Sequence, residues 1–330
     1  MNERLCCKQF QGFPEKAQKL DTSKTVIATT SSFAKESPES LELIENNGLT
    51  IILNPWGRKL SEEELKKFLE EYRPVAMLAG TEPITRSALD EAKSYLRVIS
   101  RVGVGWDNVD REFAEQLGIL VYRTEGVLAQ AVAELTIGLI LSALRHISLS
   151  DRLLRQGKWK KTMGGLLSGK VVGIIGFGNI GQRVGELITA FGAKVVYYDL
   201  QSISVPWAHA VSLPELLKQA EIITIHASGT EMILGTEELE QICKSGVILI
   251  NTARGELLDE AALQACLLEG RVSFACLDVF ESEPYCGSLC SLDNVVLTPH
   301  LGSYAKEARV LMERTAVENL LQGLYEVGVL

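Results

Sequence analysis

A chain of 330 residues is too long for one small hydrophobic core, and its length predicts about two domains. With 46% hydrophobic and 23% charged residues, the composition is that of an ordinary globular protein. The net charge of −9 argues against nucleic acid or an anionic membrane surface as the main partner.

The seven cysteines and four histidines are scattered along the chain. The only close cysteine pairs are Cys6-Cys7 and Cys286-x-x-x-Cys290, and neither has a second pair at the spacing of a metal site. We therefore expect no bound metal, and free thiols in a reducing compartment. The first residues lack the apolar core of a secretory signal, and the longest apolar stretch, residues 135–144, is too short to cross a bilayer. A cytoplasmic protein is predicted.

The first part of the chain alternates short apolar runs with segments of helical pattern. Ser61 and Glu64 have the spacing of a capping box, and Thr85 is placed to cap a short helix. Ser37 and Pro38 suit the N-cap and first turn of another helix. The predicted strands are 25–29, 49–53, 75–78, 98–102 and 119–122, preceded by an irregular extension over residues 1–23. Such alternation predicts a parallel sheet with helices on both faces.

Residues 127–156 predict one long helix between this domain and the next. Its first half is apolar on nearly all sides, which indicates a helix that is buried all round. The covering surface is either the protein's own domains or a partner subunit, and the sequence favours neither.

Residues 169–199 have the pattern of a dinucleotide site. A strand at 170–175 leads into Gly176, Gly178 and Gly181, a helix follows, and a strand at 194–198 ends at Asp199. The first two glycines permit a tight turn that brings the backbone close to a pyrophosphate, and Gly181 lets the helix and strand pack closely. The helix N-terminus attracts phosphate through its unpaired N–H groups.

Asp199 favours one of the two nicotinamide cofactors. It lies 18 residues after Gly181, where a carboxylate can accept hydrogen bonds from the ribose hydroxyls of the adenosine. The same carboxylate would repel a 2′-phosphate, and Leu200, Gln201 and Ser202 supply no cation to hold one. The sequence therefore predicts NAD rather than NADP.

Strands and helices continue to alternate after Asp199. Ser212 and Glu215 form a second capping box, and Asp259 caps a later helix. The predicted strands are 221–225, 247–250, 272–277 and 295–297, with helices near 236–244, 259–270 and 304–323. A second parallel sheet follows, and its ligands are expected beyond the carboxyl ends of the strands.

Three polar side chains come shortly after the last three predicted strands, and they are Arg254, Glu283 and His300. Each alone has a plain structural explanation, as a surface arginine, a loop acid or a loop histidine. Together, beside a dinucleotide site, they indicate hydride transfer at the C2 atom of a 2-hydroxy acid. The guanidinium of Arg254 suits the substrate carboxylate because it donates two parallel hydrogen bonds. His300 suits the proton transfer, and Glu283 beside it would favour the imidazolium and orient the ring.

In these motifs the chain resembles the D-isomer-specific 2-hydroxyacid dehydrogenases, and within them the group similar to phosphoglycerate dehydrogenase. The stretches that carry the resemblance are G-F-G-N-I-G, N-T-A-R-G-E-L-L-D-E-A-A-L, L-D-V-F-E-S-E-P and L-T-P-H-L-G-S-Y, within about residues 24–323. The resemblance implies an NAD-dependent oxidoreductase acting on CH–OH groups, with Arg254, Glu283 and His300 as catalytic residues. It also implies that the backbone of Val104 and Gly105 helps Arg254 to hold the substrate carboxylate.

Further cofactor residues are implied by the resemblance, with Asp278 facing the nicotinamide carboxamide. The positions carried over are Gly178, Asn179, Ile180, Asp199, His226, Thr230, Thr252, Asp278 and Gly302, and Gly176 and Gly181 complete the turn.

The resemblance also implies the domain organisation. A Rossmann-type NAD-binding domain, residues 127–303, is inserted into a flavodoxin-like substrate domain of residues 1–126 and 304–330. Both domains are expected to be doubly wound parallel sheets in the α/β class. The helix at 127–150 is expected to link the domains and to form the contact of a homodimer.

The substrate stays open among 3-phosphoglycerate, glycerate or glyoxylate, and a longer hydroxy acid. Phosphoglycerate dehydrogenases tend to carry an arginine for the substrate phosphate after the third strand, whereas this chain has Gly80 near that point, and Arg58 is a candidate replacement. A hypothesis of another class is a non-enzymatic, NAD-sensing protein that resembles the corepressors of this family, for which the apolar helix is the supporting feature. A third is another dehydrogenase chemistry on the same scaffold, such as formate or phosphite oxidation.

Overall fold

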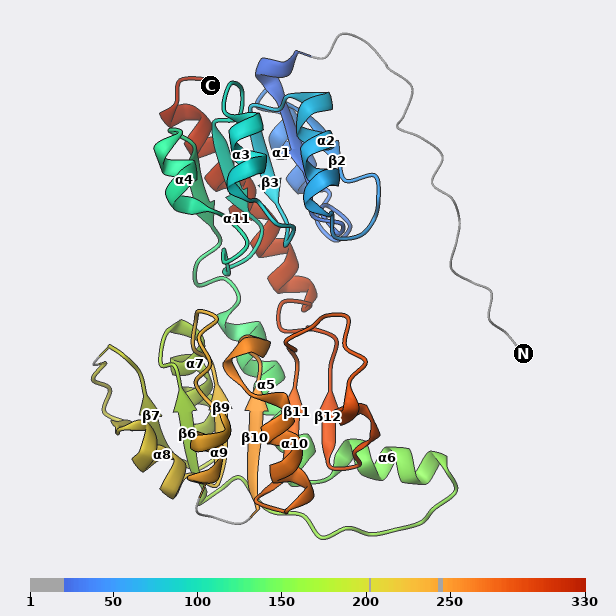
Figure 1. The fold of residues 1–330 in the computed structure, drawn as a ribbon, viewed down its shortest axis with the longest axis vertical. Helices are drawn as coiled ribbons and strands as arrows, with labels where there is room; N and C mark the ends of the chain where they lie inside the picture. The colour runs from blue at the N-terminus through green and yellow to red at the C-terminus, as the bar shows by residue number, and fades with distance from the viewer. Residues whose placement is uncertain (1–20, 202, 243–245) are drawn as a thin grey trace. The chain divides into compact units, whose positions relative to one another are not determined.

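The computed structural model describes residues 21–201, 203–242 and 246–330. The chain forms two compact units, one that comprises the chain up to Val127 together with Arg309–Leu330, and one of Leu128–Ala308. Nearly all of the predicted N-terminal extension lies outside the described residues, which open with a short 3-10 turn at Thr22–Lys24. Figure 1 shows the helices and strands of both units.

The first unit is a five-stranded parallel sheet in the order β2-β1-β3-β4-β5, which is the flavodoxin-like order expected. Its strands are β1 (Thr25–Ala28), β2 (Thr50–Leu53), β3 (Ala76–Ala79), β4 (Val98–Arg101) and β5 (Leu120–Arg123). Its helices are α1 (Glu39–Glu45), α2 (Glu62–Tyr72), α3 (Arg86–Ala92), α4 (Arg111–Gln116) and most of α11 (Lys306–Glu326).

Local sequence signals start most of these helices. Ser61 and Glu64 form the predicted capping box of α2, and the Thr85 hydroxyl accepts a hydrogen bond from the backbone N–H of Ala88 in α3. The prediction of Ser37 as an N-cap is wrong, because α1 begins at Glu39 after an uncapped Pro38. The Ser37 hydroxyl is buried and hydrogen-bonds to the equally buried hydroxyl of Ser40, at 2.9 Å.

Helix α11 returns to the first unit from the far end of the chain. The Ser100 hydroxyl of β4 donates to the carbonyl of Ala316 at 2.7 Å. Glu313 accepts a hydrogen bond from the Ala34 N–H and is paired with Arg309, both at 2.8 Å. These contacts attach α11 to β4 and to the segment that carries Ala34.

The second unit is a seven-stranded parallel sheet in the order β12-β11-β10-β9-β6-β7-β8, which is a Rossmann order with one added strand. Its strands are β6 (Val171–Ile175), β7 (Lys194–Tyr198), β8 (Ala208–Ala210), β9 (Ile222–Ile225), β10 (Val247–Asn251), β11 (Val272–Leu277) and β12 (Val295–Leu297). Its helices are α5 (Ala129–Leu144), α6 (Ile147–Arg155), α7 (Asn179–Ala190), α8 (Leu213–Gln219), α9 (Thr236–Glu240) and α10 (Glu260–Leu268), with 3-10 turns at Gly255–Leu257 and Ser288–Ser291. Both sheets together confirm the predicted fold class.

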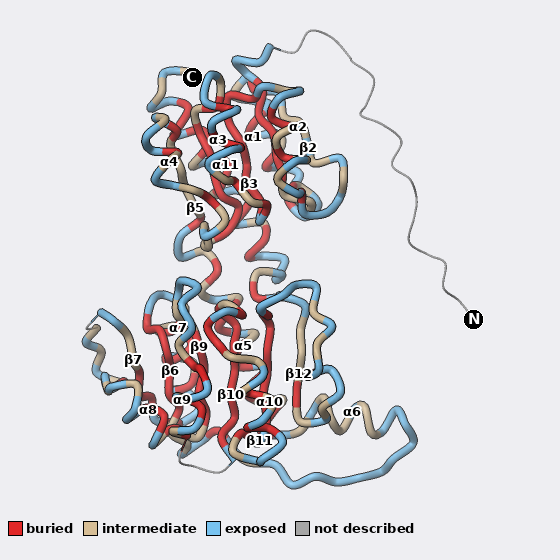
Figure 2. The backbone as a smooth tube through the Cα atoms, viewed as in Figure 1, coloured by how far each residue is buried: buried red, intermediate tan, exposed pale blue. Residues whose placement is uncertain are grey.

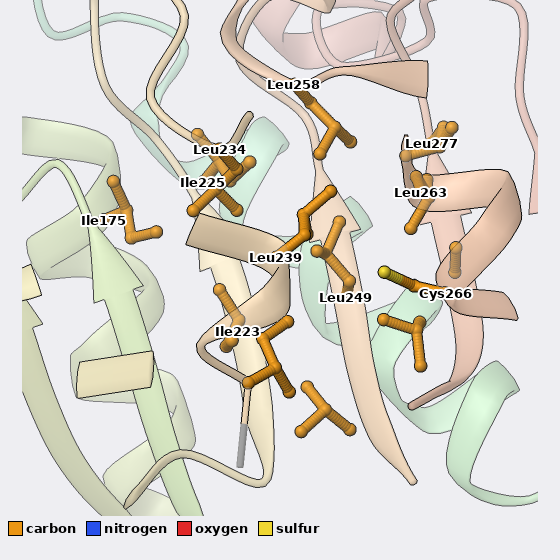
Figure 3. Packing of buried hydrophobic residues seen from close by; sticks show 14 of the residues in the cluster. Ile175, Ile223, Ile225, Leu234, Leu239, Leu249, Leu258, Leu263, Cys266 and Leu277 are labelled. Atoms are coloured by element: carbon orange, nitrogen blue, oxygen red, sulfur yellow. The ribbon is translucent and has the colours of Figure 1, made fainter. Parts of the chain in front are cut away.

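The inner strands of the second unit, such as β9 and β10, read as continuous apolar runs because both faces of the sheet are covered there. In β10, Leu249 packs in the layer formed with α8, α9 and α10, whereas Ile248 and Ile250 pack in the layer formed with α5 and α7. Figure 3 shows the first layer, with Leu239 and Leu263 on the helices above Leu249. Figure 2 shows the buried strands of each unit between more exposed helix surfaces. The edge strand β8 was not predicted, because only one of its three residues is buried.

The prediction of one long helix over residues 127–156 is wrong. The chain forms α5 and α6 with a bend of 62° between them, and His146 adopts a left-handed backbone with φ of 52°. At the end of α5 the carbonyl of Leu144 accepts a hydrogen bond from the N–H of Gly165, at 2.9 Å. Within the single chain α5 is buried along most of its length, with Glu134 and Gly138 exposed. Among the described helices, none is long and apolar enough by itself to cross a bilayer, and α5 with α6 meets that test of length and composition only as a bent pair.

Candidate active site

The turn between β6 and α7 contains three glycines, and at two of them a side chain would collide with the backbone. Gly176 has φ of 87°, and a Cβ there would lie 2.3 Å from the backbone nitrogen of Ala227. A Cβ at Gly181 would lie 2.1 Å from the carbonyl oxygen of Gly176. A Cβ at Gly178, the N-cap of α7, would meet no atom within 4 Å, so this residue borders open space. The space lies at the N-terminus of a helix of 12 residues, which begins with Asn179 and Ile180 and favours a phosphate group.

Asp199 follows β7, and its carboxylate holds this turn. Its Oδ2 accepts a hydrogen bond from the N–H of Phe177 at 2.6 Å, and its Oδ1 accepts one from Gln201 at 2.8 Å. The buried ring of Phe177 stacks on Tyr197, with ring centroids 3.9 Å apart. A carboxylate beside the turn is what recognition of an unphosphorylated ribose requires.

His226 follows β9, and its ring lies between two threonines. Its Nε2 is 2.9 Å from the hydroxyl of Thr224, and its Nδ1 is 3.4 Å from that of Thr252, which lies 3.1 Å from Thr136 in α5. Although part of the residue is exposed, desolvation lowers the pKa of His226 to about 3, so the ring is neutral at physiological pH. Thr230 is exposed in the loop that follows.

We expect acid to destabilise the protein through His226. The unfolded state binds this proton more tightly, because the pKa falls from 6.5 to about 3 on folding. The linked stability is therefore complete above pH 6.5 and is lost as the pH falls toward 3, by up to about 1.4 kcal/mol per pH unit. Urea unfolding between pH 7 and pH 4 should show a smaller loss for His226→Gln than for the wild type. Equal losses would contradict the prediction.

The three side chains expected to be catalytic follow three adjacent strands. Arg254, Glu283 and His300 come after β10, β11 and β12, which pair side by side in the sheet. The Nδ1 of His300 lies 3.0 Å from Oε2 of Glu283, and both side chains are partly exposed, at 47% and 39%. The other oxygen of Glu283 accepts a hydrogen bond from the N–H of Phe280 at 3.2 Å. The carboxylate is therefore held between its own loop and the imidazole.

Arg254 is half-buried at the start of the 3-10 turn after β10. The Asn251 side chain donates to the Arg254 carbonyl, and the Arg254 Nη1 donates to the carbonyl of Ala253, both at 2.7 Å. The next residue touches the loop that bears Glu283, since a Cβ at Gly255 would lie 1.9 Å from the carbonyl carbon of Phe280. The loops after β10 and β11 are thus in direct backbone contact.

We expect Gly255→Ala to push the Glu283 loop away from Arg254. The added methyl group has no space beside the backbone of Phe280, and overpacking of this kind costs about 1–3 kcal/mol. A thermal melt should show a lower Tm, and an activity assay should show lower kcat in the fraction that stays folded. Wild-type Tm and kcat together would contradict the contact.

Asp278 is fully buried, and it holds the segment that carries His300. Its carboxylate accepts hydrogen bonds from the Thr298 hydroxyl at 2.5 Å, from the N–H of Leu301 at 2.7 Å and from the N–H of Gly302 at 2.8 Å. Its backbone carbonyl accepts one from the His300 N–H at 2.9 Å, where His300 has φ of 55°. The family resemblance implies only a contact with the nicotinamide for Asp278. The role of Thr298 was not predicted, because no local spacing marks a hydroxyl that hydrogen-bonds to a residue 20 positions away.

Val104 and Gly105 belong to the other unit, in the loop that follows β4, where both are partly buried. Arg58, the candidate for a substrate phosphate, is paired with Glu64 through two hydrogen bonds of 2.9 and 2.6 Å. Because the guanidinium of Arg58 already pairs with the carboxylate of Glu64, it is a weaker candidate for binding a substrate phosphate.

The cysteines and acids form no metal site in the described part of the chain, where no three His, Cys, Asp or Glu side chains gather around a common point. Cys266 and Cys276 are free and buried, and burial raises the pKa of the Cys276 thiol. Cys286 and Cys290 are free and exposed.

Residues 137–302, which include the glycine turn, Arg254, Glu283 and His300, match the family described as D-isomer specific 2-hydroxyacid dehydrogenase, NAD binding domain. A hydroxypyruvate reductase of Thermotoga maritima is 39% identical over 281 residues, which are 82% of this chain and 90% of that protein. A D-3-phosphoglycerate dehydrogenase of Methanocaldococcus jannaschii is 39% identical over 263 residues, which are 76% of this chain and 49% of that protein. The crystal structure of a glyoxylate reductase from Paecilomyes thermophila has a TM-score of 0.83 at 28% identity, covering 92% of this chain and 96% of that one.

Proposed function

Because the chain belongs to the D-isomer-specific 2-hydroxyacid dehydrogenase family, we infer that it reduces a small 2-keto acid with NADH and oxidises the D-2-hydroxy acid with NAD in reverse. The observation that carries this proposal is the 3.0 Å contact between His300 and Glu283 at the carboxyl ends of the strands that follow the glycine turn. The similarities give no support to the alternative of a non-enzymatic, NAD-sensing protein.

The glycine turn fits a dinucleotide. Gly178 leaves open space at the N-terminus of α7, and the absence of a side chain at Gly176 permits the tight turn. Asp199 supplies a carboxylate beside this turn. These residues, with His226, Thr230, Thr252, Asp278 and Gly302, are the ones we propose to hold the cofactor. When bound, NADH supplies the hydride that reaches the C2 atom of the keto acid.

His300 is proposed to give a proton to the substrate carbonyl oxygen as that oxygen becomes a hydroxyl. Glu283 contacts Nδ1, so Nε2 is the nitrogen that is left to serve the substrate. The carboxylate fixes the ring orientation, and the backbone carbonyl of Asp278 accepts a hydrogen bond from the His300 N–H. Arg254 is proposed to bind the substrate carboxylate through two parallel hydrogen bonds. For Val104 and Gly105 the proposed role is substrate binding through their backbone N–H groups.

We propose that the substrate is unphosphorylated and short, such as glyoxylate or hydroxypyruvate. Gly80, which follows β3, offers no charge, and Arg58 is paired with Glu64. Arg101, at the end of β4, is also a poor candidate for a phosphate ligand, because its charge already acts on the buried carboxyl of Glu82. The reductases of glyoxylate and hydroxypyruvate among the similar proteins support the same choice.

A panel of 2-keto acids with NADH tests both the reaction and the substrate. Glyoxylate, hydroxypyruvate, pyruvate, 4-methyl-2-oxopentanoate and phosphohydroxypyruvate span the open choices. We expect kcat/KM for hydroxypyruvate to exceed that for its phosphorylated form about tenfold or more. Turnover of the phosphorylated acid alone would refute the substrate class. Failure of every acid, with NADH bound, would refute the proposed reaction.

We also propose a homodimer in the cytoplasm, without nucleic acid or membrane partners. Trp159, Met163 and Leu166 after α6 are 81%, 93% and 70% exposed, and apolar surface of this kind is commonly covered by a partner. The free thiols suit a reducing compartment, and the net charge of −9 repels anionic polymers and lipids. Light scattering should give twice the mass of one chain, and a monomer would refute the dimer.

A further inference from the structure

A carboxylic acid is buried beneath the loop of residues 103–110. Glu82, shortly after β3, is 1% exposed. Its Oε1 accepts a hydrogen bond from the Thr29 hydroxyl at the end of β1 and another, of 3.0 Å, from the N–H of Gly80. Burial raises the pKa of the Glu82 carboxyl, against the opposing effects of Thr29 and Arg101. No step of the reaction proposed above uses this acid.

The segment that carries Glu82 is hydrogen-bonded to the 103–110 loop along its length. The Asn108 side chain donates to the carbonyl of Glu82 at 2.6 Å and to that of Gly80 at 3.3 Å. The Ile84 N–H donates to the Asn108 carbonyl at 2.8 Å, and the Asp110 N–H donates back to Ile84 at 3.0 Å. Residues 80–84 are therefore attached to the loop at Asn108 and to Asp110 at its end, so that a shift of either segment would strain these hydrogen bonds.

Arg101 supports the same loop at its first residues. It is 9% exposed, its Nη1 donates to the carbonyl of Val102, and a Cβ at Gly103 would lie 2.5 Å from that Nη1. Thr29, Glu82 and Arg101 are thus three buried polar residues near the ends of β1, β3 and β4, with Thr29 bonded to Glu82 and Arg101 bonded to Val102 just before the loop. Polar groups that are bonded in this way hold one arrangement of the backbone above them.

We propose that Glu82 is a positioning residue, which fixes the 103–110 loop so that the N–H groups of Val104 and Gly105 are preformed for the substrate carboxylate. The identity of that ligand rests on the proposed function, whereas the fixing of the loop does not. A preformed site binds more tightly because its groups lose less freedom on binding.

Steady-state kinetics with NADH and hydroxypyruvate give the first test. Glu82→Ala should raise KM for the keto acid about tenfold or more and change kcat less than about threefold, because a small misplacement of binding groups weakens affinity. The Kd for NADH should stay at the wild-type value. Glu82→Gln keeps the volume and an acceptor oxygen and should restore most of the KM, and Glu115→Ala, an exposed acid in α4, serves as the matched control.

Hydrogen exchange gives a second readout that does not require turnover. In Glu82→Ala the amides of residues 103–110 should exchange about tenfold faster than in the wild type, and in Glu82→Gln they should stay protected. Thr29→Val, which removes the hydroxyl that bonds Glu82, should act in the same direction and replaces Glu82→Ala if that variant does not fold.

The outcomes separate this proposal from the proposed function. Unchanged exchange and unchanged KM in folded Glu82→Ala overturn the positioning role, even if the wild type reduces keto acids. Equally faster exchange throughout the first unit overturns it as well, since that result indicates general destabilisation. Faster exchange confined to the loop supports the role, even if no keto acid is turned over and the proposed function has failed.

Discussion

Replacement of His300 by alanine is expected to lower kcat for keto-acid reduction by about 10²–10⁴-fold, the usual contribution of a positioned acid or base. The variant removes the imidazole that lies 3.0 Å from Oε2 of Glu283. NADH should still bind, because the glycine turn and Asp199 are untouched. Stopped-flow or fluorescence titration of NADH, together with initial rates, measures both quantities.

The matched control for this variant is His209→Ala, which removes an exposed histidine from the edge strand β8 and should keep wild-type kcat. Glu283→Gln keeps an oxygen near the imidazole but removes the charge, so it should fall between the wild type and His300→Ala. Full activity in His300→Ala would show that another group moves the proton.

Replacement of Arg254 by alanine should lower kcat/KM by about 10²–10⁴-fold, because the loss of two charge-assisted hydrogen bonds is worth about 3–6 kcal/mol before compensation by water. Arg254→Lys should recover only part of this loss, since an ammonium group cannot donate two parallel bonds to a carboxylate. The defect should be large for keto acids and small for NADH affinity, which initial rates at varied substrate and an NADH titration would separate.

Arg314→Ala, which removes an exposed arginine from α11, is the control for loss of a positive charge. An Arg254→Lys variant with the full activity of the wild type would show that the guanidinium does not bind the carboxylate in the manner proposed.

Much of the fold could be predicted because both sheets are parallel. Their inner strands, such as β1, β3, β9 and β10, are buried on both faces and read as apolar runs, and β7 and β12 have the predicted bounds. The capping boxes at Ser61 and Ser212 are signals within four residues, and both are present. The break at His146 was missed because the bend depends on Gly165, which is distant in sequence from the helix pattern.

The sequence could predict which residues of the candidate site follow the ends of strands, but not the hydrogen bonds that hold them. Because the carboxyl ends of parallel strands meet at one edge, the positions of Arg254, Glu283 and His300 after successive strands indicated proximity before any distance was known. The hydrogen bonds of Asp278 and Glu82 could not be predicted. They join residues from different strands, and their strength depends on burial that the sequence pattern does not reveal.

The route of the chain sets an order for its folding during synthesis. Residues Leu128–Ala308 are continuous, so this unit can fold as soon as they have left the ribosome. The first unit emerges earlier, yet the carboxylate that bonds Ala34 and the carbonyl that bonds Ser100 belong to α11, which is translated after nearly all of the second unit. The nascent first unit therefore lacks the contacts of α11 while the second unit is being made, and apolar surface that is exposed during this interval can be bound by chaperones.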